Sequence, residues 1–295
     1  MATDPTTQSG AAGQGRIAVV AGGGALPVAV VRTLLAKGEE PLVAVVSGEA
    51  VAADFDGAEH FDIAVEDLAP LLARLRKARV DRVVLAGNIE RRPRLLSIRW
   101  SLRLLKSLPR AATGLLSGDD ALLRAVIGLM ESNNIRVVGA HEVTPDLLTP
   151  KGVLTRHAPS ADDRRDIAAG TEAARVIGSL DIGQAAIAIG GRAIALEGIE
   201  GTDGLLQRTV GLRGHGRLAG KTGGVLVKCC KSQQDRRADL PAIGADTIPA
   251  AQAAGLAGIA LDAGSTFILD FERTLEAADA AGMFIVGIEP ESRHD

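Results

Sequence analysis

The chain has 295 residues, of which 46% are apolar and 23% charged, and its formal net charge at pH 7 is −3. This length supports a sizeable core and makes two domains the first expectation, with one large domain as the alternative, while the weakly acidic balance excludes a general attraction for nucleic acid. The two cysteines, Cys229 and Cys230, are adjacent, a spacing that disfavours a structural disulfide and a Cys-x-x-Cys metal pair and fits a reducing cytoplasm.

The first predicted element is a strand that leads into a glycine turn. Residues 1–15 carry no basic start followed by an apolar run, which indicates a flexible tail rather than a signal peptide. The β-branched run Arg16–Ala21 then ends in three glycines, and residues 26–37 have helical spacing. Such a turn suits an anionic group, or it is a tight connection without a ligand. Pro27 replaces the last glycine of the dinucleotide fingerprint, which disfavours NAD binding.

The following segments alternate between strand and helix. Strands are predicted at 41–46 and 81–86, with a helix at 66–78 between them, and the second strand enters Gly87. A helix opens at Asp119 and runs to Glu131, and a strand follows at 135–138. This alternation predicts a parallel sheet covered by helices over residues 16–145.

The segment at 88–110 is basic and amphipathic. It holds seven basic residues and the single acid Glu90, interleaved with leucines, Ile98 and Trp100. We expect it to contact acyl chains or an anionic bilayer, and a surface helix with a buried stripe is the alternative. Apolar runs elsewhere remain far below the roughly 20 residues of a membrane span.

Prolines at 145, 150 and 159 make residues 146–160 a predicted linker to a second domain at 161–295. That domain begins with a helix at 161–177, and two apolar runs, 185–189 and Ala193–Leu196, then flank Gly190-Gly191-Arg192 and predict a hairpin. A basic loop at 213–221, a strand at 224–229, a charged loop at 231–239 and βαβ-like sequence complete the chain.

Two stretches of this second domain, 196–208 and 228–241, carry the strongest chemical pattern. Their carboxylates are Glu197, Glu200, Asp203, Asp235 and Asp239. Hard oxygen ligands of this kind suit Mg²⁺ or Mn²⁺. Basic side chains suited to neutralise a phosphate are Lys228, Lys231, Arg236 and Arg237. Both kinds of group are needed when water attacks phosphorus, and a solvated charged loop is the alternative.

Four motifs carry a family resemblance. AGGGALP (21–27), GDDALLRAV (118–126), LEGIEGTDGLLQR (196–208) and the pattern K-x-x-K-x-x-Q-D-x-R-x-D-x-P (228–241) occur in this order. Together they resemble the LpxI family of UDP-2,3-diacylglucosamine pyrophosphatases, from about residue 16 to about residue 290. Ser232 stands where the family commonly has proline, which predicts a looser loop.

The resemblance implies hydrolysis of UDP-2,3-diacylglucosamine to UMP and 2,3-diacylglucosamine 1-phosphate (lipid X) in lipid A biosynthesis. It implies Mg²⁺, with Mn²⁺ as the alternative, and water attack on the sugar-side phosphorus. The implied fold is α/β, a Rossmann-like N-terminal domain plus a distinct α/β C-terminal domain, with substrate between them. The implied protein is a cytoplasmic homodimer, peripheral to the inner-membrane surface.

By the same resemblance, Asp235 is the favoured catalytic residue, followed by Asp239, and both would hold the metal with Glu200. Substrate-binding residues are expected at Gly22, Gly23, Gly24, Ala25, Leu26, Pro27, Gly87, Asn88, Asp119, Asp120, Glu200, Thr202, Asp203, Lys228, Lys231, Gln234 and Arg237. The alternatives are a nicotinamide-dependent oxidoreductase and a non-catalytic protein that binds a nucleotide or lipid.

Overall fold

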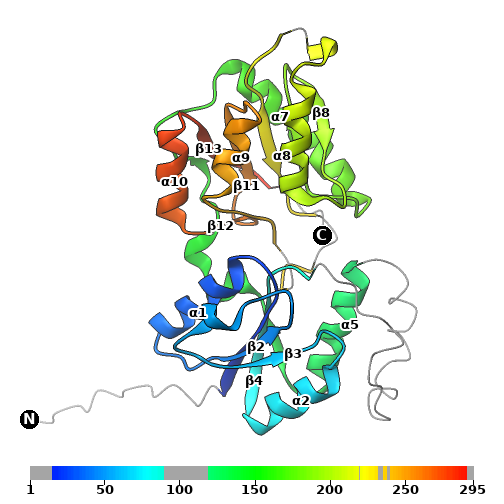
Figure 1. Ribbon diagram of the computed structural model, residues 1–295, viewed down its shortest axis with the longest axis vertical. Helices are drawn as coiled ribbons and strands as arrows, with labels where there is room; N and C mark the ends of the chain where they lie inside the picture. The colour runs from blue at the N-terminus through cyan, green and yellow to red at the C-terminus, as the bar shows by residue number, and fades with distance from the viewer. Residues whose placement is uncertain (1–14, 90–118, 219, 232–234, 238–239, 291–295) are drawn as a thin grey trace, which may run out of the picture.

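The computed structural model describes residues 15–89, 119–218, 220–231, 235–237 and 240–290, without the side chains of 119–122. These residues form two lobes (Figure 1), an N-terminal lobe that contains strands β1–β5 and a C-terminal lobe that begins after residue 147. The predicted amphipathic segment lies outside the described residues from position 90 onward, as do Gln234 and Asp239.

The N-terminal lobe is a five-stranded parallel sheet with strand order β3-β2-β1-β4-β5. Its strands are β1 (Arg16–Ala21), β2 (Leu42–Val46), β3 (Glu59–Ile63), β4 (Val80–Ala86) and β5 (Arg136–Val138). Its helices are α1 (Leu26–Ala36), α2 (Leu68–Lys77), α5 (Asp119–Ser132) and α6 (Ala140–Val143), with the 3-10 turns η1 (Ala52–Phe55) and η3 (Pro145–Leu147). This strand order is that of a Rossmann half, so the predicted fold of this lobe is confirmed.

The edge strand β3 was not predicted from the sequence. Its residues Glu59, His60 and Asp62 are exposed or partly exposed, and among its five residues only Ile63 is buried. A strand at the edge of a sheet can carry polar side chains on both faces, so the alternation that marks a half-buried strand is lost.

The C-terminal lobe has a six-stranded mixed sheet with strand order β6-β13-β11-β9-β7-β8. Its strands are β6 (Gly152–Val153), β7 (Ala185–Ala188), β8 (Ala193–Leu196), β9 (Val225–Lys228), β11 (Gly258–Asp262) and β13 (Phe284–Ile288). Its helices are α7 (Ala161–Ser179), α8 (Gly201–Leu212), α9 (Thr247–Ala253) and α10 (Phe271–Ala280), with the 3-10 turn η4 (Gly216–Leu218). β7 and β8 pair antiparallel, which confirms the predicted hairpin.

The stretch predicted as a linker, 146–160, takes part in the C-terminal lobe. Within it, β6 pairs antiparallel with β13, and Leu148 forms a bridge to Phe267. The stretch ends at Ser160, whose hydroxyl accepts from the Asp163 amide at 3.2 Å while the Asp163 carboxylate accepts from the Ser160 amide at 2.9 Å. This reciprocal pair is a capping box and defines the start of α7.

The two lobes share apolar contacts where they meet. A two-stranded sheet of β10 (Ala242–Ile243) and β12 (Phe267–Ile268) lies at this junction. Leu240, Phe267 and Leu269 belong to the same buried cluster as Ile17 and Phe55 of the N-terminal lobe. The packing therefore holds the carboxyl ends of the N-terminal strands close to the charged loop that follows β9.

Candidate active site at the junction of the lobes

The predicted glycine turn and the Gly87-Asn88 turn lie side by side after the neighbouring strands β1 and β4. The Gly23 amide donates to the Asn88 carbonyl at 2.7 Å, and the Asn88 amide donates to the Gly23 carbonyl at 3.1 Å. A side chain at Gly22 would place its Cβ 2.5 Å from the Asn88 oxygen, and one at Gly87 would collide with the Gly23 oxygen. Glycine is required here by the close approach of two backbones.

Helix α1 begins directly after this turn, with Ala25 at its N-cap and Pro27 in its first turn. The first amides of a helix have no acceptor within the helix, and the helix dipole is positive at this end. The Gly22 and Gly23 amides donate to the Ala86 and Asn88 carbonyls, so among the predicted positions Gly24, Ala25 and Leu26 place their amides at the carboxyl edge of the sheet, where α/β proteins bind ligands.

Three polar side chains mark the corresponding edge of the C-terminal sheet. Strands β8, β9 and β11 run in the same direction, because β7 is antiparallel to β8 and to β9 while β9 is parallel to β11. Glu197 follows β8, Lys228 ends β9 and Asp262 ends β11, and all three residues are buried. This edge is the second place where the fold favours a ligand.

Two of these residues are joined through Thr202. The Lys228 ammonium donates to the Thr202 hydroxyl and to the Ala242 carbonyl, each at 2.9 Å. The Thr202 hydroxyl donates to Glu197 at 2.7 Å, and the other Glu197 oxygen accepts from the Gln184 amide, also at 2.7 Å. The structure thus brings the predicted residues Thr202 and Lys228 together in a partly buried network that joins β8, α8 and β9.

Glu200, a predicted metal ligand, lies beside a shallow groove at the start of α8. The groove has a volume of about 770 Å³ and is lined by Ile182 and Leu196 as well as by Glu200. Two hydrogen bonds lower the pKa of Glu200 below its usual value. The larger effect comes from the Glu200 backbone amide, and the second from Arg208, which donates to Glu200 at 2.5 Å. Asp203 lies in the first turn of α8.

Asp262 was missed by the sequence interpretation. Its carboxylate accepts from the Cys230 amide at 3.0 Å and forms an ion pair with Arg175 at 3.8 Å. The available signal was an acid at the end of a short apolar run, the GIALD of β11. An acid at that position lies at the carboxyl edge of the sheet once the run is taken as a buried parallel strand.

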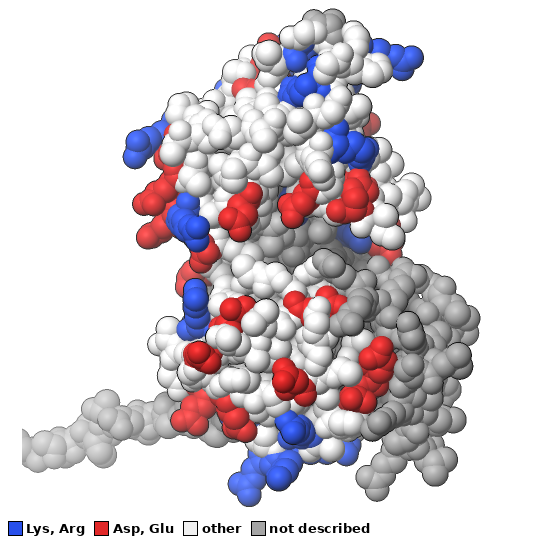
Figure 2. All heavy atoms as spheres, in the orientation of Figure 1, with Lys and Arg blue, Asp and Glu red and all other residues white. Residues whose placement is uncertain are grey.

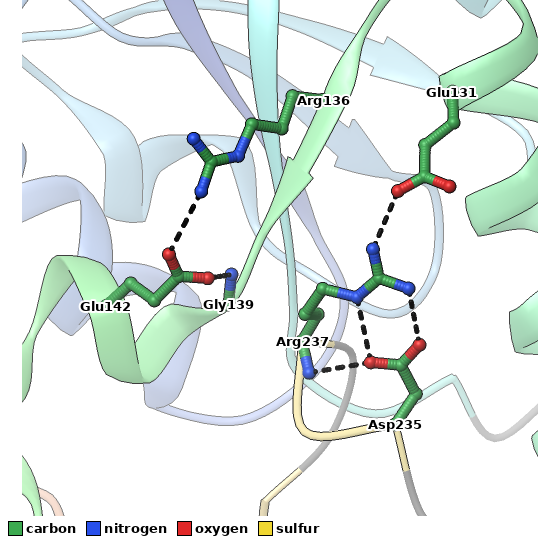
Figure 3. Close-up of polar contacts among 6 residues, drawn as sticks. All are labelled: Glu131, Arg136, Gly139, Glu142, Asp235 and Arg237. Atoms are coloured by element: carbon green, nitrogen blue, oxygen red, sulfur yellow. Dashed lines mark hydrogen bonds and ion pairs between the residues drawn. The ribbon is translucent and has the colours of Figure 1, made fainter.

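Asp235, the favoured catalytic residue, is held by Arg237 (Figure 3). The Arg237 Nε and Nη2 atoms donate to the two Asp235 oxygens at 3.0 and 2.7 Å, and the Arg237 amide donates to Asp235 Oδ1 at 3.1 Å. The third guanidinium nitrogen donates to Glu131 of α5 at 2.6 Å. Arg237 therefore lies between a carboxylate of its own loop and one of the N-terminal lobe.

These contacts keep Asp235 ionised. The hydrogen bonds from Arg237 lower the pKa of Asp235 below its usual value, against the opposing effect of burial, and the charge of Arg124 lowers it further. A carboxylate of this kind is a weak base, but it accepts hydrogen bonds from water and binds cations. The fixed fork of Arg237 also limits the directions in which the carboxylate can point.

The loop that contains Asp235 is attached to the C-terminal lobe at two further points. Lys231 forms an ion pair with Asp181 at 2.6 Å, and Arg236 donates to the Gly264 carbonyl at 2.5 Å. Lys231 and Arg237, both predicted to bind phosphate, are therefore engaged with carboxylates of the protein itself.

Whether a metal ion can bind here depends on the carboxylates around Asp235 and Glu200. On the face shown in Figure 2, acidic side chains of both lobes border the furrow between them. Within the described ranges, no three side chains among His, Cys, Asp and Glu are grouped to hold a metal ion, and Asp239 lies outside those ranges. Asp235 and Glu200 each have an arginine partner of their own. Such a site fits an ion that arrives with a diphosphate, since Mg²⁺ commonly takes one or two carboxylates plus phosphate oxygens.

Asp119 and Asp120 open α5, the helix whose last turn carries Glu131. With a rise of 1.5 Å per residue, the helix start lies about 18 Å along its axis from Glu131. The predicted helix start and the Asp235 loop are therefore separate points along α5.

Comparison with known proteins finds two matching family descriptions, the LpxI N-terminal domain over residues 16–147 and the LpxI C-terminal domain over residues 150–286. The UDP-2,3-diacylglucosamine pyrophosphatase LpxI of Caulobacter vibrioides is 37% identical over 284 residues, which cover 94% of this chain and 99% of the relative.

Similar solved structures include two enzymes. A UDP-glucose 4-epimerase of Thermus thermophilus, in complex with NAD, has a TM-score of 0.27 and 17% identity, over 50% of this chain and 41% of its own. CobK precorrin-6A reductase has a TM-score of 0.33 and 14% identity, over 95% of this chain and 89% of its own. Neither similarity is strong enough to bear on function.

Proposed function

The chain belongs to the LpxI family, and on this basis we propose that it is a UDP-2,3-diacylglucosamine pyrophosphatase of lipid A biosynthesis, which releases UMP and 2,3-diacylglucosamine 1-phosphate. The observation that carries the proposal is the 37% identity with a relative of that name over 94% of this chain. The similarity includes both lobes, so it covers both sides of the junction at which Asp235 lies.

In the proposed reaction, Asp235 directs the attacking water. Its lowered pKa keeps it ionised, and the bidentate contact with Arg237 fixes its direction. A weakly basic carboxylate contributes mainly by orienting the water and by favouring positive charge on it as the bond to phosphorus forms. Asp239 is proposed as the second carboxylate of the same loop.

We propose that the turn at Gly22–Leu26 binds a phosphate of the substrate through the backbone amides of Gly24, Ala25 and Leu26, since those of Gly22 and Gly23 donate to the Ala86 and Asn88 carbonyls. Support comes from the start of α1 and from the hydrogen-bonded turns after β1 and β4, which leave the amides of the first helical turn directed at this edge. Backbone amides donate hydrogen bonds to an anion without adding a charged side chain, which suits a furrow with acidic borders.

Mg²⁺ is the proposed cofactor, with Asp235, Asp239 and Glu200 as its proposed ligands, of which Asp239 lies outside the described residues. When bound, the ion would polarise the diphosphate oxygens and offset their charge. Chelation followed by addition of Mg²⁺ or Mn²⁺ tests this proposal, and undiminished UMP release in excess chelator would contradict it.

We further propose a homodimer located in the cytoplasm at the inner-membrane surface. Among the described residues, no helix is both long enough and apolar enough to cross a bilayer. Support for a peripheral contact comes from the diacylated substrate and from the exposed side chains of Ile182 and Ile199 near the groove. Light scattering and sedimentation with anionic vesicles test the two parts separately.

The decisive experiment is incubation of the purified protein with UDP-2,3-diacylglucosamine and Mg²⁺ in ¹⁸O-labelled water. The expected products are unlabelled UMP and a labelled lipid phosphate, because water would attack the sugar-side phosphorus. Label in UMP would place the attack on the other phosphorus. If no UMP appears and NADH binds instead, the chain is a nicotinamide-dependent protein.

A further inference from the structure

We infer that Glu131 is a positioning residue, through which the N-terminal lobe sets the direction of the Asp235 carboxylate by holding Arg237. The effect on turnover rests on the proposed function, because it takes Asp235 as the residue that directs water. The contact itself is independent of that assignment, since it is a feature of the described residues.

Arg237 is held on two sides by two carboxylates that are far apart in the sequence. Nε and Nη2 bind Asp235, whereas Nη1 binds Glu131 at 2.6 Å, 106 residues away. A guanidinium is planar, so an anchor on one nitrogen restricts the rotation of the other two. Fixing Nη1 therefore fixes the two bonds that orient Asp235 (Figure 3).

Adjacent arginines attach the loop to different lobes. Arg236 donates to Gly264 in the C-terminal lobe, and Arg237 binds Glu131 in the N-terminal lobe. Arg124 of α5 also acts on Asp235 through its charge, and positions 124 and 131, seven residues apart, lie on one face of the helix. One face of α5 is thus directed at the loop, and Glu131 makes the direct contact.

The position of Glu131 within its helix supports a role outside the helix. It lies in the last turn of α5, which has no basic residue in that turn. A carboxylate at this end faces the negative end of the helix dipole and costs stability. Pairing with Arg237 offsets that cost only when the two lobes are together.

The test compares Glu131→Ala with the wild type and with Arg136→Ala. Arg136 of β5 is the matched control, because its exposed ion pair is with Glu142 of α6 and not with Asp235 or Arg237 (Figure 3). Alanine favours helix and removes the unfavourable charge, so Glu131→Ala should keep or raise the melting temperature. The kcat for UMP release should nevertheless fall roughly fivefold with little change in KM. The kcat of Glu131→Gln should lie between those of the wild type and Glu131→Ala, because the glutamine amide oxygen can still accept one hydrogen bond.

Hydrogen exchange supplies a second readout that does not need turnover. The Arg237 amide donates to Asp235, so its exchange should accelerate in Glu131→Ala and stay unchanged in Arg136→Ala. Unchanged exchange in Glu131→Ala, or a kcat within twofold of wild type, overturns the inference. If exchange accelerates but the wild type releases no UMP, the contact is supported and the proposed function fails.

Discussion

The ammonium group of Lys228 and the hydroxyl of Thr202 are 2.9 Å apart at the carboxyl edge of the C-terminal sheet. That hydroxyl also donates to Glu197, so Thr202 lies between two buried ionisable groups of opposite charge. Its hydroxyl satisfies a donor and an acceptor at once. Thr202 therefore has a structural role whether or not it also contacts substrate.

Replacing Thr202 with valine should lower the free energy of unfolding by about 1–3 kcal/mol, because a buried donor and a buried acceptor each lose a partner. Thr202→Ser keeps the hydroxyl and should unfold close to wild type. Urea titration of the two variants measures the difference. Equal stability of the valine and serine variants would contradict this account of the network.

Replacing Asp235 with asparagine should leave the fold intact and reduce kcat roughly 100-fold or more, since the ionised group that orients water is lost. The side chain keeps its shape, and its partial exposure avoids a buried defect. Asp162→Asn on α7 removes an exposed ion pair with Arg165 and serves as the control, with wild-type kcat expected. Wild-type turnover in Asp235→Asn would remove this residue from the mechanism.

Gly22→Ala should destabilise the protein by about 1–3 kcal/mol, because its Cβ would stand 2.5 Å from the carbonyl oxygen of Asn88, a backbone atom that cannot rotate away. The displaced turn should also weaken substrate binding. Gly211→Ala is the matched control, since a Cβ there meets nothing within 4 Å and lies in α8. The control should gain about 0.5–1 kcal/mol. Thermal unfolding separates the two variants.

Asp166→Asn should change how stability depends on pH. Asp166 is buried in α7 and accepts from the Gly191 amide at 2.5 Å, and burial raises its pKa above the usual value. The folded protein therefore takes up the proton at a higher pH than the unfolded chain does. As pH falls from 7 towards about 4, the wild type should gain stability relative to the asparagine variant. Parallel stability curves would contradict this expectation.

The local sequence predicted the strand at Arg16–Ala21, the hairpin of β7 and β8 and the glycine turns, because each depends on residues close together in the chain. The contact of Glu131 with Arg237 joins residues 106 positions apart, and only the packing of α5 against the loop reveals it. An acid in the last turn of a helix was a signal that the sequence did contain. Predicting that Asp262 lies beside the end of β9 similarly required the strand order, which shows that β11 lies next to β9.

Leu240, Phe267 and Leu269 enter the same apolar cluster as Ile17 and Phe55. If the chain were cleaved between the lobes, each fragment would expose apolar side chains of this cluster, and both fragments would tend to self-associate. Heat should accordingly melt the intact chain in a single cooperative transition.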